Sequence, residues 1–441
     1  MPASRPPLTA DEIDAAAKRI ADIIEPTPLQ FNPRLSKATG ARVYLKREDL
    51  TAVRSYKLRG AYNLIVQLTP NERAAGVVAA SAGNHAQGVA FACQAMGIKG
   101  RIYVPTTTPK QKCDRIRAHG GEFVELIAVG ETYDAAAAAA AADVESTGAT
   151  MVPPFDDTRT AAGQGTIAAE ILDQLGAAPD LVIVPVGGGG CLAGIGTYLR
   201  ARSPETAILG VEPTGAASMT AALVAGGPVT LPSIDPFVDG AAVRRIGAVP
   251  YQAAAAFGGS VVSHASLPLL TATDSPEGAG SFRMMHVDEG AICTRMLDLY
   301  QNEGIIAEPA GALTVTALHE IEVEPGSTVV CLVSGGNNDV SRYGEIIERS
   351  LVHRGLKHYF LVDFPQEPGA LRRFLNEVLG PDDDITLFEY VKRNNRETGA
   401  ALVGIELGSR DGLAALLERM SATPIRCERL EPGSPAYRYL T

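Results

Sequence analysis

The chain has 441 residues and a formal net charge of −11, a length that predicts two or more domains. The acidic balance argues against nucleic acid as a partner, because nucleic-acid-binding proteins need a basic surface. No apolar stretch approaches the roughly 20 residues of a membrane span, and the first residues show no apolar segment of a secretory signal. Six scattered cysteines without a C-x-x-C pair indicate reduced thiols, a cytoplasmic location and no metal-ligand spacing.

The first residues predict a helix followed by an extended segment. Thr9 and Glu12 have the spacing of a capping box, and isoleucines and alanines recur behind them at helical spacing. The helix is expected to end near Glu25, because the prolines that follow cannot continue it. A strand over Arg42–Lys46 comes next, before a helix that begins near Lys57.

From Gly76 onward, short apolar runs alternate with segments of helical length. Because these runs lack strict polar alternation, they predict strands of a parallel sheet that helices cover on both faces. Eight consecutive alanines, Ala135–Ala142, have the highest helix propensity and predict a packed helix in this series. The expected strands are Gly76–Ser81, Arg101–Pro105, Glu122–Ile127, Leu181–Val186, Ala207–Val211 and Thr328–Ser334, and the later helices are Leu192–Arg200, Ile292–Tyr300 and Ala310–His319.

At about Ser350 the pattern changes to that of a small α+β domain. The expected order is strand, helix, strand, strand, helix, strand, which is the ferredoxin-like arrangement. The chain is therefore expected to divide into a catalytic domain over residues 1–350 and a small domain over residues 351–441. The expected elements of the small domain are Lys357–Phe364, Gly369–Leu379, Ile385–Arg393, Ala400–Leu407, Gly412–Met420 and Ile425–Leu430.

Lys57 is the first candidate for chemistry. It lies between Tyr56 and Leu58 at the expected start of a helix, where partial desolvation and the helix N-terminus both lower the pKa of an ammonium group. A neutral amine there can form a Schiff base with an aldehyde such as pyridoxal phosphate. A lone lysine is more often a surface residue, so this interpretation depends on the other motifs.

The glycine-rich stretch Val186–Cys191 follows the clearest predicted strand and precedes a helix. Four glycines let the backbone approach an anion closely, with N–H groups and the helix N-terminus directed at it, which is typical of a phosphate site. A flexible turn is the alternative. The stretch lacks the lysine of a Walker motif and the spacing of a dinucleotide fingerprint, so nucleotide binding is the weaker interpretation.

Two more loops follow predicted strands. Ser81–Gly88 presents small and amide residues that can offer N–H groups to a carboxylate, with Asn84 able to bind a cofactor oxygen. His85 in this loop is equally well explained as a packing or capping residue. Ser334–Asn338 has the equivalent place after the last strand of the first domain. Because ligands bind at the carboxyl ends of strands in open α/β sheets, all three loops are expected to converge.

These stretches in this order, with Glu308–Ala312, resemble the pyridoxal-phosphate-dependent threonine ammonia-lyases, or threonine dehydratases, of the tryptophan-synthase-β-like group (fold type II). The resemblance extends from about Leu8 to Arg349. The tail resembles the ACT-like regulatory domain of the biosynthetic enzymes, carried by His358–Pro365, Pro368–Leu371 and Asp384–Gly404.

The resemblance implies roles for single residues. Lys57 would be the Schiff-base lysine and general base, Asn84 would contact the phenolic oxygen of pyridoxal phosphate, and Ser334 its pyridine nitrogen. A neutral hydroxyl beside that nitrogen makes the ring a weaker electron sink than a carboxylate would, which favours prompt β-elimination. The phosphate would lie at Gly187, Gly188, Gly189, Gly190 and Cys191, and the substrate would bind at Ser81, Ala82, Gly83, Asn84 and His85.

The implied reaction converts L-threonine, and also L-serine, to an oxo acid and ammonia as the first step of isoleucine biosynthesis. The resemblance also implies a homo-oligomer (a homotetramer or a dimer), isoleucine as allosteric inhibitor and valine as activator. Related serine racemases carry a serine acid/base where this chain has Ala82, and an acidic cation ligand where it has Ser218, so racemisation is disfavoured and no metal is expected. Tyr56 replaces a phenylalanine common in the family.

Three alternatives stay open at the level of the sequence. The chain could be a serine/threonine dehydratase or racemase of the same family. It could be a non-catalytic amino-acid sensor, although the intact lysine, glycine loop and serine argue against this. The small domain could serve only in oligomerisation.

Overall fold

The chain folds as two units in the computed structural model, which describes residues 8–258, 260–261, 280–390, 397–431, 434 and 437. The first unit extends to Glu289 and includes Leu299–Asp339, and the second combines Gly290–Asp298 with the residues from Val340 onward. The domain boundary at residue 350 stays a prediction. Among the described residues, no helix combines the length and apolar character needed to cross a membrane.

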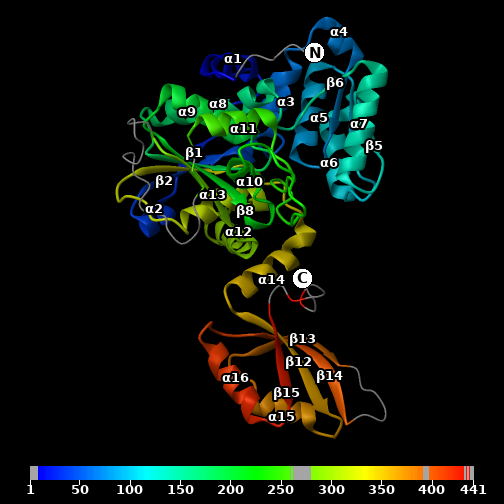
Figure 1. Cartoon of the computed structure of the whole chain (residues 1–441), viewed down its shortest axis with the longest axis vertical. Coiled ribbons are helices and arrows are strands. Elements are labelled where there is room, and N and C mark those ends of the chain that lie inside the picture. Colours follow the sequence, from blue (N-terminus) through cyan, green and yellow to red (C-terminus); the bar gives the residue numbers. More distant parts are fainter. Residues whose placement is uncertain are drawn as a thin grey trace. The chain divides into compact units, whose positions relative to one another are not determined.

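A seven-stranded sheet forms the core of the large lobe of the first unit, in the order β1-β2-β11-β7-β8-β10-β9 (Figure 1). Its strands run parallel, except that β1 is antiparallel to β2. The central strand β7 is buried along its whole length, as expected for a parallel sheet with helices on both faces. The strands are β1 (Leu29–Phe31), β2 (Arg42–Arg47), β7 (Leu181–Pro185), β8 (Ala207–Pro213), β9 (Ser260–Val261), β10 (Phe282–Val287) and β11 (Thr328–Val333).

Helices of the large lobe pack on this sheet through an apolar core that includes Val182, Val184, Leu192 and Ile195. The helix α12 is shared between the two units along the chain. The helices are α1 (Ala10–Ile20), α2 (Pro33–Thr39), α3 (Lys57–Ile65), α8 (Thr158–Leu175), α9 (Gly190–Arg202), α10 (Ser218–Ala225), α11 (Ala248–Ala256), α12 (Glu289–Glu303) and α13 (Pro309–Leu318), with short 3₁₀ helices at Glu48–Leu50 and Thr214–Ala216.

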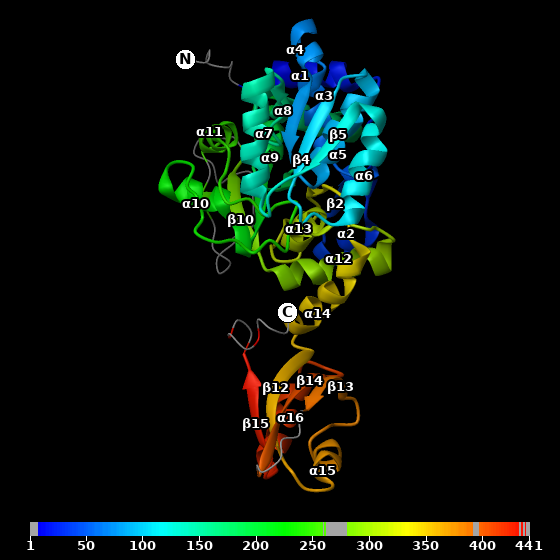
Figure 2. The same ribbon diagram turned by 90° about the vertical axis from the view of Figure 1, so that its right-hand side faces the viewer.

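A separate parallel sheet of order β5-β4-β3-β6 forms the small lobe (Figure 2). Side chains alternate between its faces, so Val77 and Ala79 pack in the core with residues of α5 and α6, while Val78 and Ala80 pack against alanines of α7. The elements are α4 (Pro70–Ala75), β3 (Val77–Ala80), α5 (Asn84–Met96), β4 (Gly100–Val104), α6 (Lys110–Gly120), a 3₁₀ helix at Gly121–Phe123, β5 (Val124–Ala128), α7 (Tyr133–Thr147) and β6 (Thr150–Met151).

Two sheets replace the single sheet that the sequence predicts. The predicted strands of the first unit are found to within a few residues. Gly76–Ser81, Arg101–Pro105 and Glu122–Ile127 belong to the small sheet, whereas Arg42–Lys46 and the strands from Leu181 onward belong to the large one. Apolar runs of similar length look alike in either sheet, so periodicity does not reveal which strands are neighbours. The predicted alanine helix is confirmed as α7, and its buried alanines are Ala136 and Ala140.

The first helix is shorter than predicted. Thr9 caps it by accepting a hydrogen bond from the Glu12 N–H, but the helix ends at Ile20 and not near Glu25. The N–H groups of Ile23 and Ile24 both donate to the Ile20 carbonyl, which closes the last turn. A proline disfavours helical backbone in the residue before it. Here the helix ends several residues before Pro26.

The C-terminal unit has the predicted ferredoxin-like order, and its antiparallel sheet has the strand order β13-β14-β12-β15. Two helices cover one face through Phe360, Phe374, Val403 and Leu416. Residues 391–393 of one predicted strand lie outside the described residues. The elements are the 3₁₀ helix Val340–Arg342, α14 (Tyr343–His353), β12 (Lys357–Pro365), α15 (Ala370–Glu377), β13 (Asp384–Tyr390), β14 (Thr398–Glu406), α16 (Gly412–Ala422) and β15 (Arg426–Leu430).

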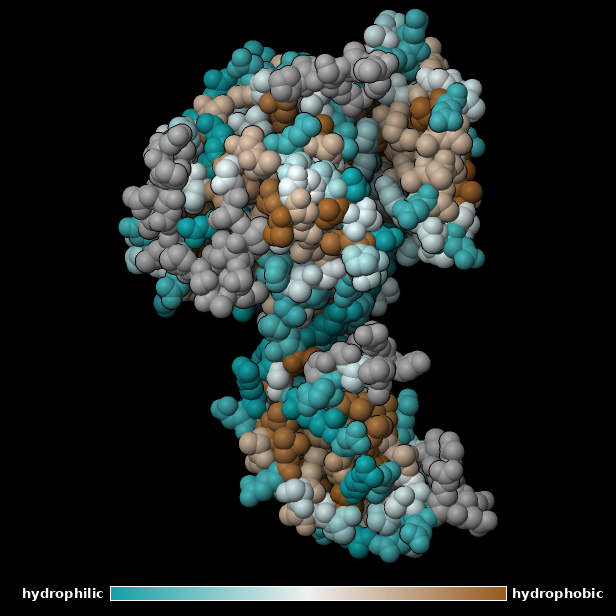
Figure 3. All heavy atoms as spheres, in the orientation of Figure 1, coloured by the Kyte–Doolittle hydropathy of each residue, from teal (hydrophilic) through white to brown (hydrophobic). Residues whose placement is uncertain are grey.

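Large apolar side chains of the C-terminal unit also reach its surface. Leu361, Leu371, Leu375 and Leu417 are between 38% and 42% exposed. Figure 3 shows hydrophobic residues among hydrophilic ones on the face of this unit that it draws. Scattered apolar residues are normal on a surface, although a contiguous group of them favours contact with another chain.

Candidate active site

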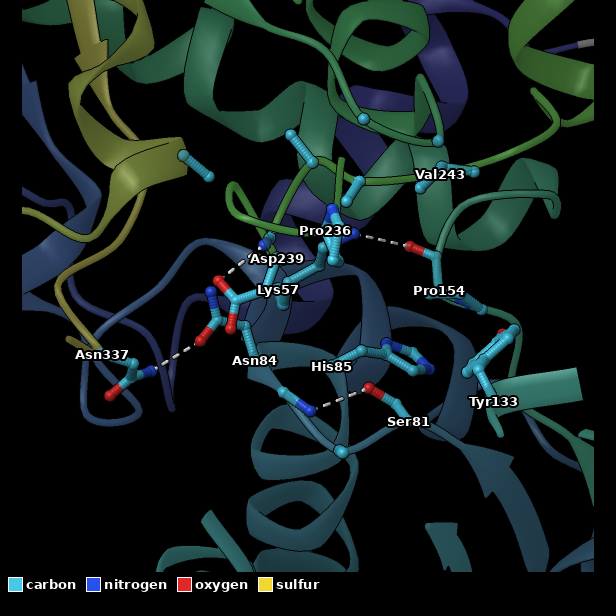
Figure 4. Close-up of a pocket in the computed structure, with 18 of the residues that line it drawn as sticks. Lys57, Ser81, Asn84, His85, Tyr133, Pro154, Pro236, Asp239, Val243 and Asn337 are labelled. Carbon is cyan, nitrogen blue, oxygen red and sulfur yellow. Dashed lines mark hydrogen bonds between the residues drawn. The ribbon is translucent and has the colours of Figure 1, made fainter. Parts of the chain in front are cut away.

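The structure brings together the loops that follow β3, β7 and β11 around one cavity of about 680 Å³ in the first unit (Figure 4). The strand ends of both lobes contribute to its wall, as expected for ligand sites at the carboxyl ends of parallel strands. Nine residues singled out from the sequence line the cavity: Lys57, Ser81, Ala82, Gly83, Asn84, His85, Gly187, Gly188 and Ser334. Gly189, Gly190 and Cys191 are not among the lining residues and lie at the start of α9.

Lys57 is the first residue of α3 and faces the cavity. Its Nζ donates to the Pro154 carbonyl oxygen at 3.2 Å and lies 5.2 Å from the centre of the Tyr56 ring. Removal from water lowers the pKa of Lys57 to about 8, against a smaller opposite effect of Glu308. A substantial fraction of the amine is therefore neutral near physiological pH, which is the form that attacks an aldehyde.

The backbone that carries Lys57 is tied to the loop after β11. The Tyr56 N–H donates to the Ser334 carbonyl oxygen at 3.1 Å, and the Gly336 N–H donates to the Arg54 carbonyl oxygen at 2.9 Å. Arg54 has a φ of 57°, an uncommon conformation for a residue with a side chain. These bonds hold Lys57 in a fixed relation to the residue expected to meet the pyridine nitrogen.

Arg59, two residues after Lys57, belongs to a buried ionic cluster. Its guanidinium donates twice to Glu48 at 2.8 Å, and to Glu170 at 2.5 and 3.0 Å. Lys46 donates to the same Glu170 at 2.5 Å, so two cations face two anions. Arg59, Glu48 and Lys46 have no exposed side-chain surface. Burial by itself disfavours the charged arginine, yet Glu48 and Glu170 raise the pKa of Arg59 above its usual value.

Close packing and backbone conformation require glycine in the loop Gly187–Gly190. A Cβ atom at Gly188 would lie 2.0 Å from the Phe155 ring, and one at Gly187 would lie 2.8 Å from the Ala241 backbone. Gly189 has a φ of 86°, which favours glycine, and it precedes the first residue of α9, so the free N–H groups of the helix start in this loop. These features fit an anion at the helix N-terminus.

The loop after β3 offers mainly backbone groups. Ser81 Oγ accepts a hydrogen bond from the Gly83 N–H at 3.2 Å, and Asn84 begins α5. His85 Nε2 lies 2.7 Å from the Val152 carbonyl oxygen, so Nε2 carries the proton. Burial and the nearby Lys57 lower the pKa of His85 to about 3. Its imidazole is neutral with an unprotonated Nδ1, so this residue can offer a carboxylate only its backbone N–H.

Ser334 and Glu308 complete the wall. Ser334 is 2% exposed, and its Oγ donates to the Ala310 carbonyl oxygen at 3.2 Å. Burial, with a smaller effect of Asp239, raises the pKa of Glu308 to about 7. Glu308 Oε1 accepts a 2.6 Å hydrogen bond from Asn84 Nδ2. The stretches around Glu308 and Asn337 supported the resemblance, but no sequence pattern assigns a role to this carboxylate or to the Asn337 amide.

Glu212 lies in β8, and Ser218, where the resemblance placed an acidic cation ligand in related racemases, begins α10. Glu212 accepts hydrogen bonds from the N–H groups of Met219 and Thr220 at 2.6 and 2.9 Å, so it caps α10. Burial raises the pKa of Glu212 to about 7. Within the described part of the chain, no group of three or more His, Cys, Asp or Glu residues is arranged to hold a metal ion.

Taken together, the cavity fits pyridoxal phosphate. It contains a lysine amine with a lowered pKa, a glycine loop before a helix for the phosphate and a buried hydroxyl at Ser334. Asn84 Nδ2 donates one hydrogen to Glu308, and its second hydrogen is available to a ligand. Bound there, the cofactor would have a polar partner near each of its polar groups.

Comparisons with known proteins agree with this fit. The sequence model of the family described as "Pyridoxal-phosphate dependent enzyme" matches residues 20–335, and that of the "C-terminal regulatory domain of Threonine dehydratase" matches residues 348–440. The chain is 69% identical to the biosynthetic L-threonine dehydratase of Mycobacterium tuberculosis over 98% of this chain and 96% of the relative. It is 60% identical to that of Corynebacterium glutamicum over 98% and 95%.

Solved structures give the same result for the fold. The processed form of threonine deaminase isoform 2 from Solanum lycopersicum is 36% identical, with a TM-score of 0.65 over 78% of this chain and 96% of that one. Maize serine racemase is 28% identical, with the same TM-score over 78% and 98%. The chain is a pyridoxal-phosphate-dependent enzyme of fold type II with a C-terminal regulatory domain, and it belongs to the family of the biosynthetic L-threonine dehydratases.

Proposed function

We propose that this enzyme converts L-threonine to 2-oxobutanoate and ammonia, the first step of isoleucine biosynthesis, and accepts L-serine as a second substrate. The observation that carries the proposal is the partly desolvated amine of Lys57 in a cavity that Asn84, Ser334 and the glycine loop also line. The names of the relatives support threonine as the substrate and a biosynthetic role. A cytoplasmic location is part of the proposal and rests on that role.

When bound, pyridoxal phosphate supplies an aldehyde that captures the substrate amine and a ring that withdraws electrons from the substrate Cα. Backbone N–H groups at Gly187 and Gly188 would hold its phosphate, and the Ser334 hydroxyl would meet its pyridine nitrogen without enforcing protonation. The N–H groups at the start of α5, from Asn84 and His85, would bind the substrate carboxylate.

Lys57 then acts as the general base. Its neutral amine would take the proton from the substrate Cα. The substrate hydroxyl leaves as water, and the nitrogen is later released as ammonia when one water adds back. Threonine thus yields one 2-oxobutanoate and one ammonia with no net change in water.

The test of the activity compares the full chain with its Lys57→Ala variant. We expect the parent to release ammonia and 2-oxobutanoate from L-threonine in equal amounts, and Lys57→Ala to lose essentially all turnover because it removes both anchor and base. Lys37→Ala, on the exposed surface of α2, is the control and should keep the parent rate. Turnover by Lys57→Ala near that of the parent would refute the assigned roles.

A serine racemase is the second candidate, because the maize enzyme has the same fold. Racemisation needs a proton donor on the second face of the substrate Cα. The residue expected there, Ala82, lines the cavity but has no group to donate a proton. L-serine should therefore give pyruvate and ammonia with essentially no D-serine.

We further propose that the C-terminal domain makes the enzyme a homo-oligomer, dimer or tetramer, inhibited by isoleucine and activated by valine. The match to a threonine dehydratase regulatory domain supports the control, and the exposed leucines of this unit support association. Allosteric coupling is typically about 1–3 kcal/mol, so isoleucine should shift the threonine affinity several-fold. A chain that ends after Ser350, folded and loaded with cofactor, should lose this response. Equal sensitivity of both chains would leave the domain as an oligomerising module.

A further inference from the structure

Asn337, in the loop after β11, uses its backbone N–H and both ends of its side-chain amide in hydrogen bonds. Its Nδ2 donates to the Val53 carbonyl oxygen and to Asn84 Oδ1, both at 2.8 Å. Its Oδ1 accepts from Arg115 Nη1 at 2.7 Å, and its backbone N–H donates to Glu308 Oε2 at 3.2 Å. A side-chain amide has two hydrogens and one carbonyl oxygen, so each has a partner here.

These contacts fix which way round the Asn84 amide lies. Asn84 Oδ1 faces the Asn337 amino group, and Asn84 Nδ2 faces the Glu308 carboxyl group at 2.6 Å. Turning the Asn84 amide over would set its oxygen against the carboxyl group and its amino group against that of Asn337. With Glu308 ionised, neither of these contacts would then be a hydrogen bond, so the observed orientation is the one that satisfies both groups. Figure 4 shows Asn337 beside Asn84, joined to it by a dashed line.

The hydrogen bonds of Asn337 also join the two lobes of the first unit. Arg115 lies on α6 and Asn84 begins α5, both in the small lobe, whereas Asn337 follows β11 and Glu308 precedes α13 in the large lobe. A shift of the small lobe relative to the large one would therefore disturb the contacts that orient the Asn84 amide.

We propose that Asn337 is a positioning residue, which directs the free amide hydrogen of Asn84 at the phenolic oxygen of the cofactor. This rests on the proposed function, in which Asn84 meets that oxygen. Without the hydrogen bond from Asn337, the Asn84 amide turns and no longer donates to the phenolic oxygen. The proton shared between the phenolic oxygen and the nitrogen on Lys57 then shifts, which changes the absorption of the bound cofactor.

The test is Asn337→Asp in the full-length holoenzyme. The aspartate has the same shape and still accepts from Arg115, but it cannot donate to Asn84 or Val53. We expect the ratio of visible to near-ultraviolet absorption of the bound cofactor to fall at least about two-fold. We expect kcat to fall about ten-fold, the lower end of the loss that follows when a residue supporting a binding residue is removed. The KM for threonine should stay within about two-fold, because Asn337 does not hold the substrate.

Two further variants separate positioning from general loss of structure. Asn71→Asp makes the same chemical change at an exposed site on α4 and should leave spectrum and kcat unchanged. In an Asn84→Ala background, Asn337→Asp should change the absorption ratio no further, because the residue that it positions is gone. The melting temperature is recorded for each variant.

Three results would overturn the proposal, and a fourth would overturn the proposed function. An absorption ratio and kcat of Asn337→Asp equal to those of the parent would overturn the proposal, and so would a full additive effect in the Asn84→Ala background. A lower melting temperature with an unchanged absorption ratio would also overturn it, because Asn337 would then be only structural. If the parent with pyridoxal phosphate showed no visible band and no turnover, the proposed function itself would fail.

Discussion

The polar groups on the two sides of Lys57 differ in how they are paired. Along α3, Arg59 joins the other charged groups in a cluster in which every charge is paired, and none of its fully buried members lines the cavity. On the cavity side, Lys57 shares the wall with the amides of Asn84 and Asn337 and with Glu308, whose pKa is raised to about 7. The first arrangement fixes the backbone that carries the lysine, whereas the second can change its proton and its hydrogen bonds when a ligand enters. On α3, Arg59 thus serves stability, and Lys57, two residues earlier, serves reactivity.

Breaking the ionic cluster should have the largest effect. Arg59→Leu leaves Glu48 buried without its cation, and removing one partner of a buried pair costs about 3–5 kcal/mol. We expect that loss in the free energy of unfolding, measured in urea. Arg117→Leu, on the exposed surface of α6 with a 3.3 Å pair to Asp114, should cost less than about 1 kcal/mol.

A double variant sharpens this test. Arg59→Leu with Glu48→Leu removes one cation and one anion and leaves the pair of Lys46 and Glu170 intact. It should be more stable than Arg59→Leu alone, because no buried carboxylate then lacks a partner. A single variant within about 1 kcal/mol of the parent, or a double variant less stable than the single one, would show that the cluster does not hold α3.

The contribution of the cavity side to the free energy of unfolding should depend on pH between about 5.5 and 8, whereas that of the ionic cluster should not. The pKa of Glu308 is raised from its ordinary value near 4.5 to about 7 in the folded chain, so the folded state binds an extra proton between those values. Its stabilisation is complete below about pH 4.5 and is lost as pH rises through 7. Between pH 5.5 and 8 the parent should lose about 2 kcal/mol relative to Glu308→Gln, which does not titrate.

The measurement is urea unfolding of the cofactor-free protein at both pH values. Glu145→Gln, at an exposed position of α7, is the control and should follow the parent at both. If Glu308→Gln kept a constant difference from the parent across this range, the carboxyl group would titrate in the unfolded and folded states alike, and the contrast between the two sides of Lys57 would be weaker.

The sequence predicted the parts of the site that are local in the chain. Lys57 and the glycine loop are short motifs at the junction of a strand and a helix, so their context is visible in the neighbouring residues. The ionic cluster is not, because Glu48, Arg59 and Glu170 come from three separate elements and meet only after folding. The partners of Asn337 are likewise far apart in the chain, at separations of 29 to 284 residues.

The same limit applies to the fold. Strands and their order along the chain follow from apolar runs, and the ferredoxin-like order of the C-terminal unit follows from six elements in sequence. The division into two sheets depends on which strands pair, and the pairing of β2 with β11 joins residues nearly 290 positions apart, such as Arg42 with Thr328. No local pattern carries that information.

The smallest effect is expected for the hydroxyl group of Tyr56. Burial raises the pKa of this phenol well above its usual value, so it stays neutral. What lies beside Lys57 is the ring, 5.2 Å from Nζ to its centre, and phenylalanine keeps the ring. Tyr56→Phe should therefore keep kcat and the KM for threonine within about two-fold of the parent, a difference of about 0.4 kcal/mol. Tyr56→Leu removes the ring that lies beside Lys57 and should lower kcat more, because the amine loses the side chain that limits its position. A ten-fold loss of kcat in Tyr56→Phe would instead assign a direct role in the reaction to the hydroxyl, and the cavity side of Lys57 would then include a second proton donor.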